Sequence, residues 1–167
     1  MVDNWCRTRR KELITMIKNA ALLLVLLLMT KLYAEAPKYD FDNPEYVKNY
    51  DGDTITFNLK DVHPLLGKDI SVRVYGIDAP ELKTTNACEK ERAIKAKDLV
   101  YTSLKNAKTI QLKDCARDKY FRMLCKVFFD NKSLSAELLK QGLAYEYYGK
   151  TKEEIDWCLS EPNKTNN

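Results

Sequence analysis

Three stretches of the chain alternate apolar with polar residues and are rich in β-branched side chains. They are residues 46–50, 54–59 and 70–75, and this two-residue period is typical of strands with one buried face. Residues 108–113 and 123–129 show the same tendency and are joined by a polar segment. The pattern therefore predicts five strands, with a short turn between the first two and a hairpin formed by the last two.

A longer segment, residues 87–106, has apolar residues at helical spacing and follows Thr85 and Asn86, either of which would cap a helix. The predicted apolar stripe consists of Ala93, Ala96, Val100, Tyr101 and Leu104. The charged residues, which we expect to form a solvated face without chemistry, are Glu89, Lys90, Glu91, Arg92, Lys95, Lys97 and Asp98. Two shorter helices are predicted over residues 134–141 and 152–158.

The chain begins with a basic segment that is followed by an unbroken apolar run over residues 20–29. This run is too short for a membrane-spanning helix, which needs about 20 residues. A basic flank, a short apolar core and a small residue soon after it are typical of a secretory signal peptide. We therefore predict that residues 1–34 are a leader removed by cleavage after Ala34.

Other interpretations of the leader remain open. Cleavage after Ala36 and a true start at Met16 are both compatible with the sequence. A retained membrane anchor over residues 13–32 is a third possibility, but Lys18 and Lys31 interrupt it and argue against it. Only a retained anchor would bring the protein into contact with a membrane.

The rest of the chain has the composition of one domain between two irregular segments. Residues 35–45 contain Pro37 and Pro44, several acids and few aliphatics, so we predict a linker there. Residues 46–159 hold all the periodic segments and are long enough for a single hydrophobic core. Residues 160–167 are polar and are predicted to be a disordered tail.

Removal of the leader changes the charge balance. Residues 1–34 hold six of the 28 Lys and Arg and two of the 24 Asp and Glu, so the remainder has 22 of each and is formally neutral. A neutral domain must bind nucleic acid through a local arrangement of cations. The best candidates lie on or beside the predicted hairpin and are Arg117, Lys119, Arg122 and Lys126.

Four cysteines remain outside the leader, an even number that suits an oxidising compartment. Three pairings are possible. We favour Cys115 with Cys125 across the hairpin, and Cys88 with Cys158 between the main helix and the C-terminal segment. Metal binding by these thiols is less favoured, because the spacing lacks C-x-x-C and His63 is the only histidine. We assign His63 no catalytic role.

Four short motifs carry the candidate chemistry. They are residues 51–54 (Asp-Gly-Asp-Thr), Arg73, residues 78–81 (Asp-Ala-Pro-Glu) and residues 118–122 (Asp-Lys-Tyr-Phe-Arg). Carboxylate oxygens are the ligands of hard cations such as Ca²⁺ and Mg²⁺. The planar fork of arginine matches pairs of phosphate oxygens. This combination is typical of a metal-dependent phosphodiesterase, because a phosphodiester is anionic and gains negative charge when attacked.

In the order and spacing of these motifs, residues 46–148 resemble the staphylococcal nuclease (thermonuclease) family. The resemblance implies an α+β fold: a five-stranded OB-type β-barrel with one main helix after strand 3 and short C-terminal helices. Barrels of this type bind oligonucleotides on an open face. In the family, the position of Ala79 is usually threonine and that of Phe121 often glycine, so this chain departs from the pattern at two places.

The resemblance also implies roles for individual residues. Asp53, Asp78 and the main-chain carbonyl of Ala79 would bind Ca²⁺, with Asp51 just outside them. The remaining roles are Glu81 as general base on the attacking water, Arg73 and Arg122 on the phosphate, and Lys119, Tyr120 and Tyr148 on the substrate. We expect the acidic groups to face the paired guanidinium groups across a gap of one phosphate.

These expectations define a function and a rival. The function is an exported, Ca²⁺-dependent nuclease that hydrolyses DNA and RNA with little sequence preference and leaves 3′-phosphates. Its location would be the periplasm or the medium, and it would act as a monomer without an obligate protein partner. The rival is a catalytically inactive OB module that binds nucleic acid or a protein.

Overall fold

The computed structural model describes residues 15–24, 38–118, 122–149 and 155–159 of the 167-residue chain. The chain divides into two compact units, residues 1–36 and 37–167. In the first unit, residues 15–24 form an exposed helix. Within the described residues, no helix is both long and apolar enough to cross a membrane. The predicted tail and most of the predicted leader lie outside the described residues.

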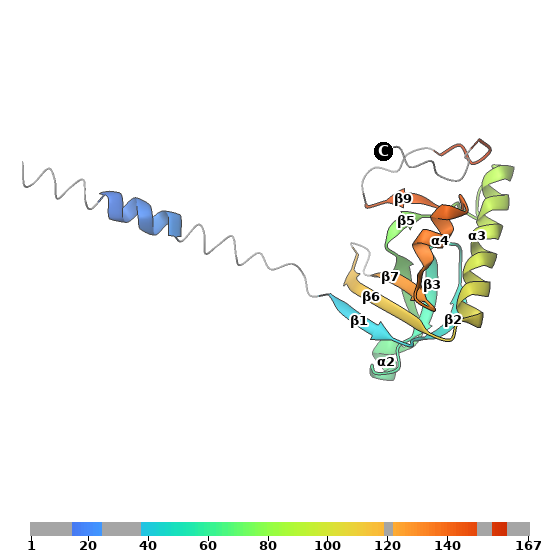
Figure 1. Ribbon diagram of the computed structural model, residues 1–167, viewed down its shortest axis with the longest axis horizontal. Coiled ribbons are helices and arrows are strands. Elements are labelled where there is room, and N and C mark those ends of the chain that lie inside the picture. Colours follow the sequence, from blue (N-terminus) through green and yellow to red (C-terminus); the bar gives the residue numbers. More distant parts are fainter. Residues whose placement is uncertain (1–14, 25–37, 119–121, 150–154, 160–167) are drawn as a thin grey trace, which may run out of the picture. The chain divides into compact units, whose positions relative to one another are not determined.

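The second unit combines strands and helices, as predicted for the α+β class (Figure 1). Its described strands are β1 (Tyr39–Asp42), β2 (Glu45–Asn49), β3 (Thr54–Asn58), β4 (Ile70–Val74), β5 (Gly76–Asp78), β6 (Ile110–Arg117), β7 (Met123–Phe129), β8 (Lys132–Ser133) and β9 (Tyr145–Tyr147). Its described helices are α2 (Pro64–Gly67), α3 (Ala87–Asn106) and α4 (Leu134–Lys140).

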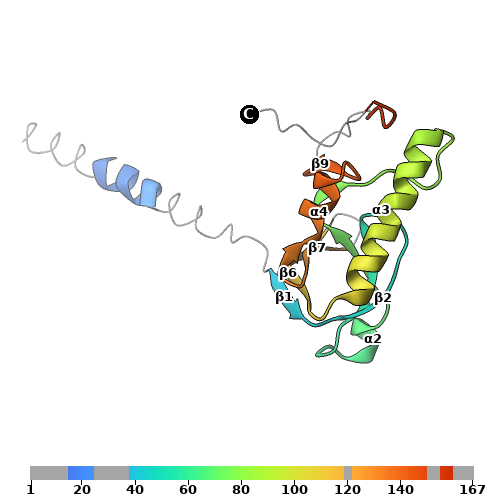
Figure 2. The ribbon, with the colours of Figure 1, turned by 45° about the vertical axis from the view of Figure 1, so that its right-hand side comes forward.

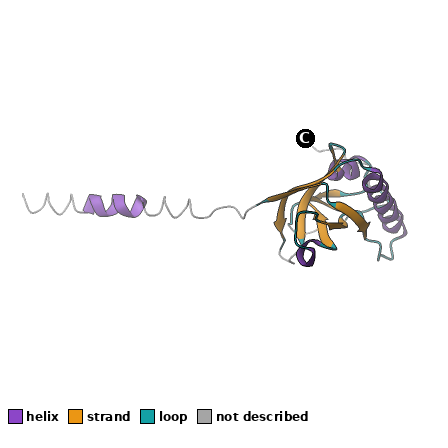
Figure 3. Cartoon of the chain, turned by 90° about the horizontal axis from the view of Figure 1, so that it is seen from below, coloured by secondary structure: helices purple, strands orange, loops and turns teal. Residues whose placement is uncertain are grey.

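One seven-stranded sheet dominates the unit. Its order is β1-β6-β7-β4-β3-β2, with β8 paired to β7, while β5 and β9 form a separate two-stranded sheet. The β4–β7 pair is parallel and the other pairs are antiparallel. Viewed from below, the strands curl around a common core with α3 to one side (Figure 3). Among the described strands, β1 and β2 stand at the two ends of this order. A closed five-stranded barrel is therefore not shown.

Most predicted strands are confirmed with small changes of boundary. Residues 123–129 form β7 as predicted. The strands predicted over residues 46–50 and 54–59 end one residue earlier than expected. The strand predicted over residues 108–113 begins later and continues to Arg117. Strands β5, β8 and β9 and the four-residue helix α2 were not predicted, because each is too short to show a period.

Strand β1 corrects the predicted linker over residues 35–45. Residues 39–42 pair with β6, at the end of the sheet path. The Asp42 carboxylate accepts hydrogen bonds from Gln111 Nε2 (2.9 Å) and Lys113 Nζ (3.1 Å). The sequence of β1, Tyr-Asp-Phe-Asp, alternates aromatic with acidic residues, but four residues between Pro37 and Pro44 are too few to show a period, so the segment resembles a linker.

The third predicted strand, residues 70–75, is interrupted at a point that matters for the site. Strand β4 ends at Val74, and β5 begins at Gly76, whose φ of +86° lies in the region that glycine adopts without steric cost. The chain thereby leaves the large sheet. Asp78 then pairs with Tyr145 in the antiparallel β5–β9 sheet.

Helix α3 has the predicted bounds and is shown beside the sheet in Figure 2. The Asn86 side chain caps it by accepting a hydrogen bond from Glu89 N (3.1 Å). Its buried residues are Ala93, Ala96, Val100 and Leu104. Tyr101, predicted for the buried stripe, is half exposed, and its ring packs edge-on near Tyr46 with centroids 6.4 Å apart. The aliphatic part of the predicted stripe is therefore confirmed.

The two predicted C-terminal helices have different outcomes. Helix α4 is confirmed, with the Ser133 hydroxyl as its N-cap. The predicted helix over residues 152–158 is wrong for residues 155–158, the part that the structure describes. Residues 157–159 form a turn. The Asp156 carboxylate accepts a hydrogen bond from Cys158 N (2.9 Å), a local contact that competes with helix formation.

Both favoured disulfides form. Cys115 and Cys125 join β6 to β7 with their Cα atoms 4.3 Å apart. Cys88, in the first turn of α3, joins Cys158 with their Cα atoms 5.2 Å apart. Two disulfides are typical of proteins in an oxidising compartment. By loop-closure entropy, the second closes the longer loop and stabilises the fold more, by about 4 kcal/mol against about 3 kcal/mol.

We expect substitution of Gly52 by alanine to destabilise the fold. An added Cβ would lie 2.8 Å from the Cβ of Ala96 and 2.9 Å from the Cβ of Ala79, so either helix α3 or the turn must shift. The expected cost is about 1–3 kcal/mol in the free energy of unfolding, measured with urea. Ser71→Ala, at an exposed position of β4, is the control and should change stability by less than about 0.5 kcal/mol. Equal stability of Gly52→Ala and the parent would contradict the close packing.

Candidate active site

The turn between β2 and β3 is built to hold one carboxylate inward. The Asp51 carboxylate accepts hydrogen bonds from Asp53 N (3.0 Å) and Thr54 N (2.7 Å), which closes the turn. Asn49 fixes its base, because Asn49 Nδ2 donates to the carbonyls of Asp51 (2.9 Å) and of Lys97 in α3 (3.0 Å). Asp53 is consequently buried, with only 2% of its surface exposed. Asp51 shapes the turn, and Asp53 points into the site.

Arg73 joins the two predicted metal ligands. Its side chain leaves β4 on the face opposite Val72 and Val74, as the alternation of the strand predicts. Nη1 donates to Asp53 Oδ1 (2.8 Å), and Nη2 donates to Asp78 Oδ1. This differs from the expected gap of one phosphate, because the guanidinium lies directly against both carboxylates.

Each buried carboxylate has a further donor on its second oxygen. Asp53 Oδ2 accepts a hydrogen bond from Ala79 N (2.8 Å), which ties the β2–β3 turn to the loop after β5. Asp78 Oδ2 accepts one from the Tyr145 hydroxyl (2.7 Å). Asp78 is as buried as Asp53, with 3% of its surface exposed. The orientation of both carboxylates is therefore fixed by the protein.

The charges around Arg73 do not cancel. Burial raises the pKa of the Asp53 carboxyl to about 7, and Asp51 and Asp78 add to this rise although Arg73 opposes it. Burial by itself would lower the pKa of Arg73, but Asp53 and Asp78 outweigh burial and raise it. One guanidinium thus faces three carboxylates, which leaves an excess of negative charge.

This excess suits a divalent cation. The carboxylates of Asp53 and Asp78 and the carbonyl of Ala79 would supply only hard oxygen ligands. In the part of the chain that the structure describes, no three His, Cys, Asp or Glu side chains are arranged to hold a metal ion. The protein would therefore provide few ligands, and solvent would complete the coordination. Arg73 and the cation would share the same two carboxylates.

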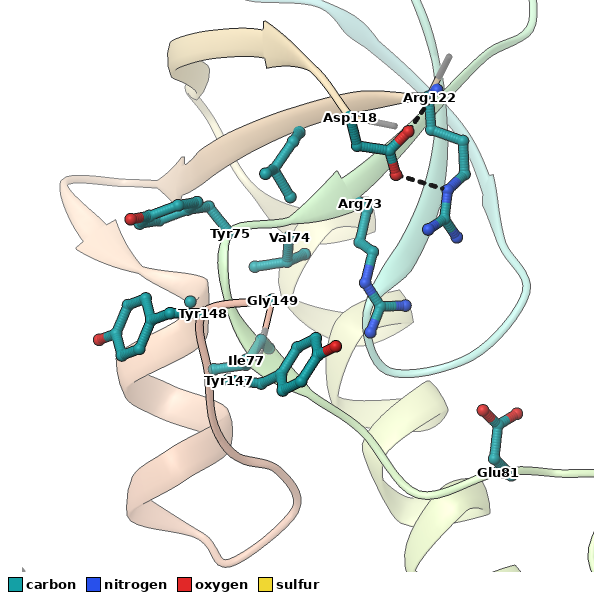
Figure 4. Close-up of a pocket in the computed structure, with 12 residues that line it drawn as sticks. Arg73, Val74, Tyr75, Ile77, Glu81, Asp118, Arg122, Tyr147, Tyr148 and Gly149 are labelled. Carbon is teal, nitrogen blue, oxygen red and sulfur yellow. Dashed lines mark hydrogen bonds and ion pairs between the residues drawn. The ribbon is translucent and has the colours of Figure 1, made fainter. Parts of the chain in front are cut away.

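Arg122 is held at the far side of the site by Asp118. Its Nε donates to Asp118 Oδ2 (2.9 Å), and its main-chain N donates to Asp118 Oδ1 (2.9 Å). Arg73, Arg122 and Glu81 line one pocket of about 510 Å³. In Figure 4 both guanidinium groups and the Glu81 carboxylate point into the same space. A pocket of this size accommodates a nucleotide-sized ligand.

The loop that carries Glu81 is anchored by Glu89 of α3. Glu89 Oε1 accepts a hydrogen bond from Glu81 N (3.1 Å), and Glu89 Oε2 accepts one from the Thr84 hydroxyl (2.6 Å). The Glu81 side chain itself is exposed. Glu89 is therefore more than part of a solvated face, and the sequence-based interpretation of it is wrong.

The aromatic side of the pocket is formed by three tyrosines, Tyr75, Tyr147 and Tyr148. Tyr148 was predicted, and its ring packs edge-on against Tyr75 with centroids 5.8 Å apart. Tyr75 and Tyr148 are exposed (41% and 61%), which makes their faces accessible to a base. The predicted substrate residues Lys119 and Tyr120 lie outside the described residues.

Two residues that orient the predicted site residues were not identified from the sequence. Asp118 belongs to a motif that gives it no role by itself, and no sequence pattern marks Tyr145 as a partner of Asp78. Pairing of Tyr145 with Asp78 depends on the β5–β9 sheet, whose strands are too short to recognise. The spacing of Asp118 and Arg122, four residues apart in the sequence, was the one usable signal.

Comparisons with known proteins agree with the motifs. Residues 71–164 match the family described as Staphylococcal nuclease homologue. The chain is 31% identical over 129 residues to an uncharacterized endonuclease of Haemophilus influenzae, an alignment that covers 77% of this chain and 66% of that protein. It is 38% identical over 121 residues to endonuclease YncB of Bacillus subtilis, covering 66% of this chain and 52% of that protein.

A third relative is the SPbeta prophage-derived endonuclease YokF of Bacillus subtilis, 39% identical over 114 residues, with 61% of this chain and 34% of that protein covered. The chain thus spans between about one third and two thirds of the length of these relatives. The family match extends over more than half of the chain and contains Arg73, the Asp78–Glu81 loop and the motif at residues 118–122. This protein belongs to the staphylococcal nuclease family.

Proposed function

We propose that this protein is an exported, Ca²⁺-dependent nuclease that hydrolyses phosphodiester bonds of DNA and RNA with little sequence preference and leaves 3′-phosphates. The observation that carries the proposal is the convergence of Arg73, Arg122 and Glu81 on one pocket, beside the buried carboxylates of Asp53 and Asp78. The endonuclease names of its relatives support the reaction class.

The two arginines would bind and stabilise the phosphate. A phosphodiester gains negative charge on its oxygens as it is attacked, and preorganised cations lower the free energy of that transition state. Arg122 is oriented by the bond from its Nε to Asp118, which directs the outer nitrogens of its guanidinium toward the pocket. Arg73 is oriented in the same way by Asp53 and Asp78. Both positions are fixed before the substrate arrives.

Glu81 would act on the attacking water. Its carboxylate is exposed at the pocket, while its main chain is held by Glu89. A carboxylate that faces the pocket can accept a hydrogen bond or a proton from water. The Glu81 carboxylate lies across the pocket from the two guanidinium groups in Figure 4, which supports this role.

Asp53, Asp78 and the carbonyl of Ala79 would hold Ca²⁺, which supplies Lewis acidity and neutralises charge on the phosphate. The donor set is all oxygen, as Ca²⁺ prefers, and the site carries excess negative charge without it. Asp51 would contribute through the turn that it closes and not as a ligand.

Little sequence preference follows from the pocket lining. Tyr148 offers a ring on which any base can stack. Outside the described residues, Tyr120 would add a second ring, and Lys119 would add a positive charge for the phosphate backbone of the substrate. Single-stranded segments of DNA or RNA fit this mode because their bases are free to stack.

Export is supported by two independent features. The leader predicted over residues 1–34 has the organisation of a signal peptide, and the two disulfides need an oxidising compartment to persist. The protein would therefore act in the periplasm or the medium, where Ca²⁺ is available. No second subunit is needed to complete the pocket as proposed, so a monomer suffices.

Removal of Ca²⁺ should abolish cleavage. We expect turnover of single-stranded DNA in Ca²⁺ and none in EGTA, and Asp53→Asn or Asp78→Asn should lower the rate on the order of 10²–10³-fold. Asp61→Asn, at an exposed loop position, is the control and should cleave like the parent. Equal turnover in Ca²⁺ and EGTA would rule out the metal mechanism. DNA binding in saturating Ca²⁺ without cleavage would favour the inactive OB module.

Replacement of Arg73 by lysine should remove most activity while keeping the charge. Lysine cannot bridge Asp53 and Asp78 with two parallel bonds, and it cannot grip two phosphate oxygens at once. We expect a loss of roughly 10²-fold or more in kcat/KM. Lys105→Arg, the reverse exchange at an exposed position of α3 outside the pocket, should keep normal kinetics. Normal rates in Arg73→Lys would refute the assigned role.

The raised pKa of Asp53 should make stability depend on pH in the absence of metal. Its folded pKa of about 7 lies above the unfolded value of 3.8, so its contribution is fully present below pH 4 and is lost as the pH rises through 7. Urea unfolding in EDTA should show the parent losing stability relative to Asp53→Asn between about pH 4 and pH 7, by an amount on the order of a few kcal/mol. A pH-independent difference between the two proteins would exclude this ionisation.

A further inference from the structure

The C-terminal segment reaches the candidate cation site through two aromatic rings. Tyr145 faces Asp78 across the β5–β9 sheet, and its hydroxyl donates to Asp78 Oδ2 (2.7 Å). On the other side, the ring of Tyr145 packs against the ring of Trp157 with centroids 6.0 Å apart. Trp157 is buried, with 6% of its surface exposed.

Two anchors fix Trp157 to helix α3. The next residue, Cys158, is bonded to Cys88 in the first turn of that helix. Arg92, one turn further along, donates from Nε to the Trp157 carbonyl (2.8 Å) and from Nη1 to the Gly142 carbonyl (2.9 Å). Arg92 therefore clamps the C-terminal segment and the residues before β9 to the same helix. Its helical spacing alone predicts only a place on the solvated face.

We propose that Tyr145 is a positioning residue for the Asp78 carboxylate, and that the Cys88–Cys158 disulfide maintains this position by holding Trp157 against Tyr145. This inference rests on the proposed function in one respect, since Asp78 is the proposed cation ligand. A residue that orients a metal ligand typically changes metal affinity by about 10–100-fold when it is removed.

The chemistry of the hydrogen bond indicates that Tyr145 orients Asp78. A tyrosine hydroxyl carries the hydrogen and an ionised carboxylate oxygen can only accept, so Tyr145 is the donor to Asp78 Oδ2. Arg73 holds one oxygen of Asp78 and Tyr145 holds the other, so the carboxylate plane is fixed at both ends. Loss of the Tyr145 hydroxyl would remove one donor from a buried carboxylate.

The test begins with Tyr145→Phe, which removes the hydroxyl and keeps the ring. Calorimetric titration of the full chain should show Ca²⁺ binding weakened about 10–100-fold. Tyr39→Phe, at an exposed position of β1, should bind Ca²⁺ like the parent. Unchanged Ca²⁺ affinity in Tyr145→Phe would overturn the positioning role.

Fluorescence tests the second half of the proposal. The chain has two tryptophans, Trp5 and Trp157, so Trp5→Phe makes Trp157 the only one. In that background, Cys88→Ala/Cys158→Ala should shift the emission of Trp157 to longer wavelength and weaken Ca²⁺ binding as Tyr145→Phe does. Adding Tyr145→Phe should then weaken binding little further, because both changes act on one contact.

Cys115→Ala/Cys125→Ala is the matched disulfide control. It removes the other disulfide, so it should lower the temperature of unfolding while leaving the emission of Trp157 unchanged. Far-UV circular dichroism identifies variants that fail to fold, and Tyr145→Phe keeps both disulfides. An unchanged emission, or fully additive losses of Ca²⁺ affinity, after removal of Cys88 and Cys158 would overturn the role of the tether.

Failure of the proposed function is distinguishable from failure of this inference. If the parent protein binds no Ca²⁺, the metal-dependent mechanism falls. The contact is then measured in EDTA with a double-mutant cycle of Tyr145→Phe and Asp78→Asn in urea unfolding. Non-additive changes in the unfolding midpoint would show that Tyr145 and Asp78 interact. Additive changes would rule out this interaction.

Discussion

The bridge formed by Arg73 between Asp53 and Asp78 is the interaction on which the site depends. Two carboxylates that are almost completely buried would repel each other and lose hydration, so neither would be stable there without a shared cation. The same guanidinium lines the pocket, where it can bind phosphate. One side chain therefore stabilises the folded protein and belongs to the proposed catalytic group.

The backbone is arranged to make this bridge possible. Val74, one residue after Arg73, donates its N–H to the Asp53 carbonyl (2.9 Å), which places the β2–β3 turn beside the end of β4. Gly52 lets the turn approach α3 and Ala79 closely. The break at Gly76 then redirects the chain so that Asp78 returns toward Arg73. One hydrogen bond and two glycines thus bring Asp53 and Asp78 to the same guanidinium.

Features with a period or a motif were predictable from the sequence. Helix α3, strand β7, both disulfides and the inward face of Arg73 follow from spacing and alternation. The residues that orient the predicted ones were not predictable. Arg92 and Glu89 look like ordinary surface charges on a helix, and only the folded chain brings them to the Trp157 carbonyl and the Glu81 main chain. Strand β1 was missed because it has only four residues and lies between two prolines.

Charge links the fold to substrate binding. The chain outside the predicted leader is formally neutral, so its attraction for nucleic acid must come from local groups. Without a cation, the excess of carboxylates around Arg73 opposes an incoming phosphate. A divalent ion held by Asp53 and Asp78 would reverse the sign of that field and leave both arginines available to the anion. Affinity for substrate and catalytic competence would therefore rise together, because both depend on the same change of charge.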